Sequence, residues 1–419
     1  MRRFFLLLCA TFLWADLALA GPYSLTGNQR WIALASRQNM DEAIGIAQIY
    51  AWRLKGVRVM QSTNGWYAVV AGPHEGTDIR VVRNTLANTG SVPKDILLSK
   101  GDGYVAEVWS RKTPEYLLEA EYEGGDQAQI VTFRDVRMTL SRQPTKENDN
   151  FYPTLVATRA GKTIFETKAD EVERDEPSSN VIALRLDPTT AFPQFVFSAF
   201  TGGAHCCTQT KFITQTGDDW RVIEGALLDA DGYWYDDLDG DGALEILSAD
   251  NSFYYAYASY AESRAPVRIA QLRHGQLQDV TKDPKFAPWI RQRLYAMEYE
   301  ATQDADLWRS NGFLAAWVAN KALVGEFDQA WVKMTISYNS SSDWPLTECM
   351  APRGADGLCP PGKEIALSYP SALRKHLQAE AYIPADVAAP PAAAKPASSS
   401  APALPVTPAP PTSAFSVPP

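Results

Sequence analysis

The fold of the first part of the chain is decided by four short stretches: WIALAS at residues 31–36, DEAIGIAQIYAWRL at 41–54, VRVMQ at 57–61 and WYAVVA at 66–71. The first, third and fourth predict strands, whereas the second places its apolar residues on one helical stripe. Gly56 predicts the end of that helix, and Asn64-Gly65 predicts a tight turn between the last two strands. The pattern is therefore strand, helix, strand, strand.

A second helix beginning at Thr77 or Asp78 and ending at Asn88, followed by a strand up to Leu98, completes a βαββαβ order. This order, with WIALAS, Asp41-Glu42-Ala43 and WYAVVAGP at 66–73, resembles the SPOR family of bacterial envelope modules. The resemblance implies a ferredoxin-like fold over residues 28–110 and binding to the glycan strands of peptidoglycan. The site residues that it carries over are Ser36, Tyr67 and Gly72.

A run with four acidic residues and two glycines, Asp237-Leu-Asp-Gly-Asp-Gly-Ala-Leu-Glu245, carries the strongest binding signal in the chain. Carboxylates at the first, third, fifth and ninth positions, with glycine at the sixth, suit the all-oxygen shell of Ca²⁺. Ser248 stands where an EF-hand needs Glu, so we expect a compact cation loop within a β-hairpin. An Asp/Gly-rich turn without metal is the alternative. The expected ligands are Asp237, Asp239, Asp241, the carbonyl of Ala243, and Glu245.

Residues 1–20 have the layout of a secretory signal peptide, with two arginines, an apolar stretch and small residues before Ala20. We expect cleavage there and a location in the periplasm or cell envelope. No later stretch is long and apolar enough to span a bilayer, so we expect no membrane span in the mature chain. The formal net charge of −10 and the lack of a basic run argue against nucleic-acid binding.

Four cysteines remain after the signal peptide, an even number that predicts two disulfides in an exported protein. Their connectivity stays open, because adjacent cysteines either pair with each other or staple two regions together. The string TGGAHCC at 201–207 also places His205 beside two thiols, so a transition-metal site and a catalytic thiol are weaker alternatives to a disulfide. The cysteines are Cys206, Cys207, Cys349 and Cys359.

Residues 111–282 are rich in short strands and turns and predict a β-rich domain. Two stretches in it, around Leu184 and around Tyr235, look like repeats of one hairpin. The second resembles the FG-GAP calcium repeats of integrin-type β-propellers, which implies propeller-like hairpins rather than a closed propeller. Phe253, Tyr255 and Tyr257 alternate as one strand face, which favours core packing over a sugar-binding platform.

From residue 283 to 383 the apolar period becomes helical, with helices expected around 289–301, 313–323, 326–336 and 370–379. Residues 384–419 are almost entirely Ala, Pro and Ser, and we expect an extended tail without a core. The predicted fold class is therefore α+β: a ferredoxin-like module, a β-rich domain, a helical C-terminal part and a disordered tail.

The function that these features favour is that of a non-catalytic exported envelope protein, which binds peptidoglycan and carries a structural Ca²⁺. A secreted hydrolase acting on cell-wall or carbohydrate polymers is an alternative, since paired catalytic carboxylates need not be close in sequence. A third hypothesis is a protein-binding adaptor or inhibitor whose partner is another envelope protein. It follows from Ala68 and His74, which stand where many SPOR modules have an arginine and an aromatic residue.

Overall fold

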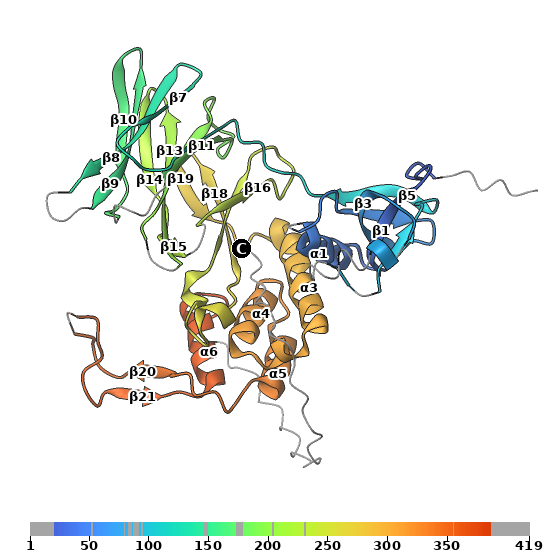
Figure 1. Cartoon of the computed structure of the whole chain (residues 1–419). Coiled ribbons are helices and arrows are strands. Elements are labelled where there is room, and N and C mark those ends of the chain that lie inside the picture. Colours follow the sequence, from blue (N-terminus) through green and yellow to red (C-terminus); the bar gives the residue numbers. More distant parts are fainter. Residues whose placement is uncertain are drawn as a thin grey trace, which may run out of the picture. The chain divides into compact units, whose positions relative to one another are not determined.

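The computed structural model describes residues 21–386, apart from positions 52, 79, 83–85, 87–91, 94, 146–149, 173–178, 203–204, 230–231 and 355. The expected signal peptide and residues 387–419 of the expected tail lie outside the described residues. The chain divides into two compact units, Met1–Arg111 and Lys112–Pro419, and each combines helices with antiparallel sheets (Figure 1). The α+β class is thereby confirmed.

The first unit is built on one antiparallel sheet with the strand order β4-β1-β3-β2-β5. Its helix α1 contacts β1, β2 and β3, and buries Ala43, Ile46 and Ala47. The second expected helix lies partly outside the described residues, although Arg80 to Val82 are helical. The elements are β1 (Gln29–Arg37), α1 (Met40–Ala51), β2 (Arg58–Ser62), β3 (Tyr67–Glu75), β4 (Leu97–Ser99) and β5 (Tyr104–Ser110).

The second unit begins with three antiparallel sheets. Their strands are β6 (Leu118–Tyr122), β7 (Gln129–Phe133), β8 (Val136–Pro144), β9 (Phe151–Arg159), β10 (Lys162–Lys168), β11 (Ser179–Leu184), β12 (Gln194–Phe200), β13 (Cys206–Thr216), β14 (Asp219–Glu224), β15 (Leu228–Asp229), β16 (Trp234–Asp236), β17 (Glu245–Ala249), β18 (Val267–Arg273) and β19 (Gln276–Asp279). The orders are β10-β9-β8-β7, then β14-β13-β12-β11-β6 with β15 on β13, and β16-β17-β18-β19.

The middle sheet, β14-β13-β12-β11-β6, packs against a core on each face. Successive side chains of a strand alternate between faces, so neighbouring residues enter different cores. Val181 of β11 belongs to a core shared with β8 and β9, whereas its neighbour Ile182 belongs to a core shared with β17 and β18. Phe195 and Val196 of β12 divide in the same way. Because the middle sheet shares one core with each of the other two, the three sheets form one stacked body. Burying a side chain of this size contributes about 1.5–3 kcal/mol to the folding free energy.

Four helices cover the far face of the β16–β19 sheet. Leu247 and Ile269 of that sheet share a core with Phe313, Trp331 and Leu373 of the helices. The expected boundary at residue 282 thus marks a change from strands to helices within a continuous core. The helices are α3 (Ala287–Gln303), α4 (Asn311–Leu323), α5 (Phe327–Ser337) and α6 (Tyr369–Ala379), with the short 3-10 helices η1 (Asn251–Phe253), η2 (Tyr260–Glu262), η3 (Pro284–Phe286) and η4 (Ala305–Arg309).

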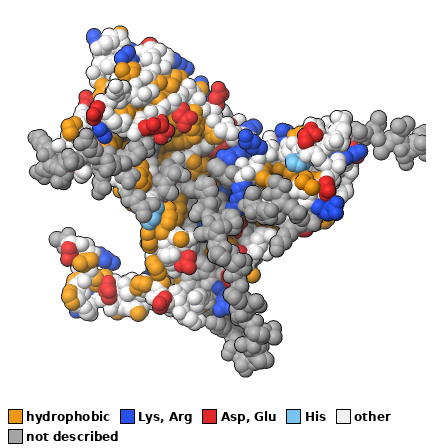
Figure 2. Space-filling view, viewed as in Figure 1, with side chains coloured by type: hydrophobic (Ala, Val, Ile, Leu, Met, Phe, Trp, Pro, Cys, Tyr) orange, Lys and Arg blue, Asp and Glu red, His pale blue; other side chains and the backbone are white. Residues whose placement is uncertain are grey.

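A small hairpin of β20 (Thr347–Cys349) and β21 (Glu364–Ala366) extends from the helices (Figure 1). Figure 2 shows hydrophobic atoms at its surface, and Met350, Leu358 and Ile365 are exposed on it.

The expected strand at Phe253, Tyr255 and Tyr257 is wrong. The side chain of Asp250 accepts a hydrogen bond from the Ser252 N–H and caps η1, so the chain turns instead of extending. Phe253 and Tyr257 are buried in the core as expected, whereas Tyr255 has a positive φ of 58° and is 48% exposed.

Candidate metal centre

The acidic run forms the loop between β16 and β17, which pair antiparallel up to Asp236 and Glu245. Within the loop, Asp237 Oδ1 accepts from the Gly240 N–H at 2.8 Å, and Asp241 Oδ1 accepts from the Ala243 N–H at 2.7 Å. Gly240 and Gly242 take positive φ angles of 76° and 83°, which side-chain-bearing residues adopt at a cost. The glycines therefore permit the sharp turn that gathers the carboxylates.

Three of the five expected ligands lie together: carboxylate oxygens of Asp237, Asp239 and Glu245 all lie within 4.8 Å of one another. Asp241 is not in this group, and its Oδ2 lies 3.6 Å from Arg273. Ala243 is buried, and its N–H donates to Asp241. The structure therefore brings together the carboxylates expected at positions one, three and nine of the loop.

Glu245 is fully buried, at 0% exposure. Burial raises the pKa of its carboxyl group, and the negative charges of Asp239 and Asp241 add to this, against hydrogen bonds that lower it. Those bonds come from the Leu238 N–H at 2.8 Å and from Gln271 Nε2 at 2.6 Å. A positive charge near the loop would favour the ionised form of Glu245.

Lys285 in η3 supplies one such charge, and nothing in the local sequence of the loop indicates it. Its Nζ lies 2.8 Å from Asp239 Oδ2. Burial raises the pKa of Asp239, but the hydrogen bonds from Lys285 and the Asp241 N–H, together with the positive charges of Lys285 and Arg273, outweigh this, so the net shift is downward. The hydrogen bond between Lys285 and Asp239 also raises the pKa of Lys285. The ammonium and a metal ion would therefore compete for one carboxylate.

The β11–β12 hairpin, which resembles β16–β17 in sequence, shows how the start of the second strand is hydrogen-bonded to the loop when the acidic cluster is absent. There Gln194 occupies the first position of the second strand, and its Oε1 accepts from the N–H groups of Leu186 and Asp187, both at 2.8 Å. Glu245 makes the corresponding bond to Leu238. Because a neutral amide closes the first hairpin, the charge of Glu245 is not needed to close the second. All-oxygen donors around a buried carboxylate fit a hard cation such as Ca²⁺.

The three residues carried over from the SPOR resemblance do not form one surface. Ser36 is exposed and lies opposite Ala68, whereas Tyr67 is half-buried and lies opposite Arg37. Since Tyr67 and Ala68 are successive, Ser36 and Tyr67 point to opposite faces of the sheet. Gly72 lies five residues after Tyr67 in β3, with a φ of 120° and an added Cβ that would lie 2.8 Å from the His74 nitrogen.

One face of the first sheet is covered by the segment that precedes it. Trp31, Met60 and Val70 are buried there, and Tyr23 and Leu25 pack against them. Trp31 Nε1 donates to the Tyr23 carbonyl at 3.0 Å. A ligand that uses this sheet face must therefore displace residues 23–25.

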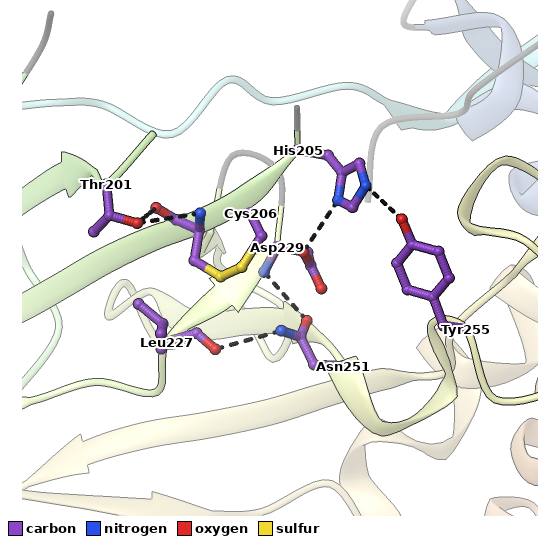
Figure 3. The surroundings of a disulfide bond; sticks show 8 residues. Thr201, His205, Cys206, Leu227, Asp229, Asn251 and Tyr255 are labelled. Carbon is purple, nitrogen blue, oxygen red and sulfur yellow. Dashed lines mark hydrogen bonds and ion pairs between the residues drawn. A yellow bond between two sulfur atoms is a disulfide. The ribbon is translucent and has the colours of Figure 1, made fainter. Parts of the chain in front are cut away.

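The disulfides are Cys206–Cys207 and Cys349–Cys359, one of the three connectivities left open by the sequence. Around the first, His205 Nδ1 lies 3.4 Å from Asp229, and its Nε2 lies 2.6 Å from the Tyr255 hydroxyl (Figure 3). Sequence reasoning missed Asp229 and Tyr255 here, since both are distant in the chain.

Another histidine without an expected role, His376, is partly buried between hydroxyl groups. The Tyr257 hydroxyl lies 2.8 Å from its Nδ1, and the Ser252 hydroxyl lies 2.8 Å from its Nε2. Burial lowers its pKa. These contacts are those of a satisfied structural histidine.

Among the described residues, no helix has both the length and the apolar character needed to cross a bilayer. The model of the sll0997 C-terminal domain family matches residues 290–381, which include most of α3 and all of α4, α5 and α6. No solved structure is significantly similar to the chain.

Two curated proteins are similar over most of the chain. The uncharacterized protein y4bJ of Sinorhizobium fredii is 39% identical over 389 residues, which are 92% of this chain and 61% of that protein. The chain thus spans less than two thirds of this relative. The probable thylakoid lumen protein sll0997 of Synechocystis is 32% identical over 300 residues, 70% of this chain and 84% of that protein. This chain therefore belongs to the same family as sll0997.

Proposed function

We propose that the protein is a non-catalytic, exported component of the cell envelope whose larger unit is stabilised by Ca²⁺ bound at Asp237, Asp239 and Glu245. The observation that carries the proposal is the pair of equivalent hairpins, in which Gln194 closes one loop and a buried Glu245 closes the acidic one. A buried carboxylate beside two aspartates is stabilised in its charged form by nearby cations, and Ca²⁺ would add two positive charges to the single charge of Lys285.

The role that we assign to the cation is structural. When bound, Ca²⁺ neutralises the three carboxylates. The chain holds them in place through the Leu238 N–H and Gln271 on Glu245, and through the Gly240 N–H on Asp237. The loop ends on β17, which lies in the middle of the β16–β19 sheet. Ordering the loop would therefore stabilise this sheet and the two cores on its faces. We also propose that these hairpins are propeller-like, as the FG-GAP resemblance implies.

Calorimetric titration and thermal unfolding test the calcium proposal. We expect one Ca²⁺ per chain and a melting temperature that falls when Ca²⁺ is chelated with EGTA. Asp239→Ala should lower the melting temperature and abolish its dependence on Ca²⁺. Asp218→Ala, in the exposed turn between β13 and β14, is the matched control and should retain both. Equal melting of the wild type with Ca²⁺ and with EGTA contradicts the proposal.

For the first unit we propose a ferredoxin-like SPOR module that binds peptidoglycan glycan strands. The strand order β4-β1-β3-β2 supports the fold, and the exposed Ser36 supports an accessible site at one end of β1. Retention on amidase-treated sacculi tests binding, with untreated sacculi and an unrelated exported protein as controls. Retention no greater than that of the control protein contradicts wall binding.

A protein-binding adaptor or inhibitor is the second candidate, and the cover of Tyr23 and Leu25 over the sheet face favours it. Failure on sacculi together with intact Ca²⁺ binding would support this candidate over the first. The lumen location in the name of sll0997 supports an exported, non-cytoplasmic setting. Within that setting, the periplasm is our proposal.

A further inference from the structure

The disulfide Cys206–Cys207 lies at the start of β13, where the chain pairs with the short strand β15. Cys206 is directly opposite Asp229 in this pairing. Both sulfur atoms and a carboxylate oxygen of Asp229 lie within 4.8 Å of one another. Cys206 is exposed, whereas Cys207 is 7% exposed. The sulfur pair is thus within reach of solvent and lies beside a negatively charged oxygen.

Asp229 is held in this position by neighbours from other segments. His205 Nδ1 lies 3.4 Å from its Oδ1, and its backbone N–H donates to Asn251 Oδ1 at 3.4 Å (Figure 3). The His205 ring is itself fixed, because it stacks on Tyr260 at 3.8 Å and contacts the Tyr255 hydroxyl at 2.6 Å. Only 13% of the Asp229 side chain is exposed. The Asp229 carboxylate is therefore held in place for binding a metal ion.

We propose that Cys206, Cys207 and Asp229 form a redox-gated site for a thiophilic divalent cation of the Zn²⁺ class. In the oxidised protein the two sulfurs are bonded to each other and offer no thiolate. A dithiol reductant transfers two electrons and two protons, so that the S–S bond breaks, two thiols form and the reductant becomes a disulfide. The cation then displaces the two thiol protons and gains two thiolates and one carboxylate as ligands.

The spacing of the donors suits such an ion. Zn²⁺ binds sulfur at about 2.3 Å and carboxylate oxygen at about 2.0–2.2 Å in a tetrahedral arrangement, which places donors about 3.3–3.8 Å from one another. The Asp229 oxygen already lies within 4.8 Å of both sulfur atoms, and the two sulfurs separate from bonding distance to about 3.8 Å once the S–S bond is broken. The third donor comes from a paired strand, so the adjacent cysteines need not supply the whole shell together with His205. The fourth position is open to water.

The second disulfide provides a comparison within the same chain. Cys349 and Cys359 close the loop of the β20–β21 hairpin, and among the described residues no group of three metal-binding side chains includes them. Reduction there should yield two thiols without a third donor. The two pairs therefore differ in the property that the proposal requires, a neighbouring carboxylate.

The test uses the full chain, purified oxidised, and a sample reduced with dithiothreitol that is then removed anaerobically. Cd²⁺ is the probe, because thiolate ligation gives ultraviolet charge-transfer absorption that carboxylate ligation does not. We expect one thiolate-bound Cd²⁺ per reduced chain, displaceable by Zn²⁺, and none in the oxidised chain. Cys349→Ser with Cys359→Ser should leave this binding intact.

Asp229→Asn should keep the reduced thiol count and weaken Cd²⁺ binding by about tenfold or more. If Asp229→Asn fails to fold, the comparison of oxidised and reduced wild-type protein still decides the question. Equal Cd²⁺ absorption in the two redox states overturns the proposal. So does unchanged affinity in a folded Asp229→Asn variant, or loss of the signal in the Cys349/Cys359 variant with Cys206 and Cys207 present.

Discussion

Replacing Glu245 by Gln should affect the stability of the protein in opposite directions with and without Ca²⁺. The new amide can accept from the Leu238 N–H, as Gln194 accepts from Leu186. Gln271 can turn its own amide so that its oxygen accepts from the new NH₂ group. The substitution therefore preserves the shape of the loop and removes one charge from the fully buried position.

Without Ca²⁺, the sign of the stability change on Glu245→Gln follows from the raised pKa of Glu245 in the folded state. Its stabilising contribution is fully present below the unfolded pKa of about 4.3 and is lost as the pH rises through the folded pKa. In EGTA, raising the pH should therefore destabilise the wild type relative to Glu245→Gln, which has no charge to bury, so the variant should be at least as stable at pH 7. The two proteins should converge at pH 4.

With Ca²⁺, the size of the gain in unfolding free energy follows from mass action. Free Ca²⁺ at about 100 times its Kd adds about 2.7 kcal/mol to the unfolding free energy, or about 5–10 °C in Tm for a unit of this size. If losing the Glu245 carboxylate weakens binding about 100-fold, the same Ca²⁺ concentration adds only about 0.4 kcal/mol to the variant. The Ca²⁺-dependent gain should thus shrink several-fold.

Scanning calorimetry at pH 7, with EGTA and with Ca²⁺, measures both effects on the same samples. Two results would refute the reasoning. One is a Ca²⁺-dependent gain in Glu245→Gln equal to that of the wild type. The other is a variant that melts below the wild type in EGTA, because the loop would then need the carboxylate for a reason other than metal binding.

Three further substitutions test neighbouring contacts. Lys285→Met should strengthen Ca²⁺ binding about 2- to 5-fold in a calorimetric titration, since the ammonium paired with Asp239 no longer competes; weaker binding would contradict this. Asp250→Asn should cost about 2 kcal/mol in urea unfolding at pH 7, because it removes the buried carboxylate that pairs with Arg268 and accepts from the Tyr382 hydroxyl, while Arg268 keeps its pair with Glu380. Because the folded pKa of Asp250 is lowered, this cost should disappear as the pH falls through that pKa, and a pH-independent difference would count against it. Tyr23→Ala should increase retention on amidase-treated sacculi by uncovering the first sheet, and unchanged retention would argue against glycan binding through that face.

Much of the secondary structure could be predicted from the sequence, because apolar period and turn residues act locally. The stretch at 31–36 lies in β1, the stripe at 313–323 lies in α4, and Pro370 lies in the first turn of α6. The alternation of Phe253, Tyr255 and Tyr257 misled because the Asp250 cap begins a 3-10 turn, a local hydrogen bond that periodicity does not register.

The candidate sites were predictable only where their residues are close in sequence. Asp237, Asp239 and Glu245 occupy one loop, so their spacing indicated the candidate metal centre. Lys285 reaches the same loop from η3, and Asp229 reaches the cysteines from β15, through tertiary packing that no short motif encodes. For the same reason the sequence could suggest Ser36 and Tyr67 as partners without showing that they face opposite sides of the sheet.

The acidic loop between β16 and β17 is also connected to the helical part, most of which the family model matches. Lys285 lies in η3, two residues before α3, and its ion pair with Asp239 joins the β16–β17 loop to the start of the helical part. A second pair, Arg268 with Glu380, joins the same sheet to the end of α6 without using a candidate ligand. A cation at Asp239 would release only the first connection. Calcium binding should therefore be coupled more strongly to the attachment of α3 than to that of α6. Hydrogen exchange that slows or quickens equally in both helices on adding Ca²⁺ would show that the coupling does not run through Lys285.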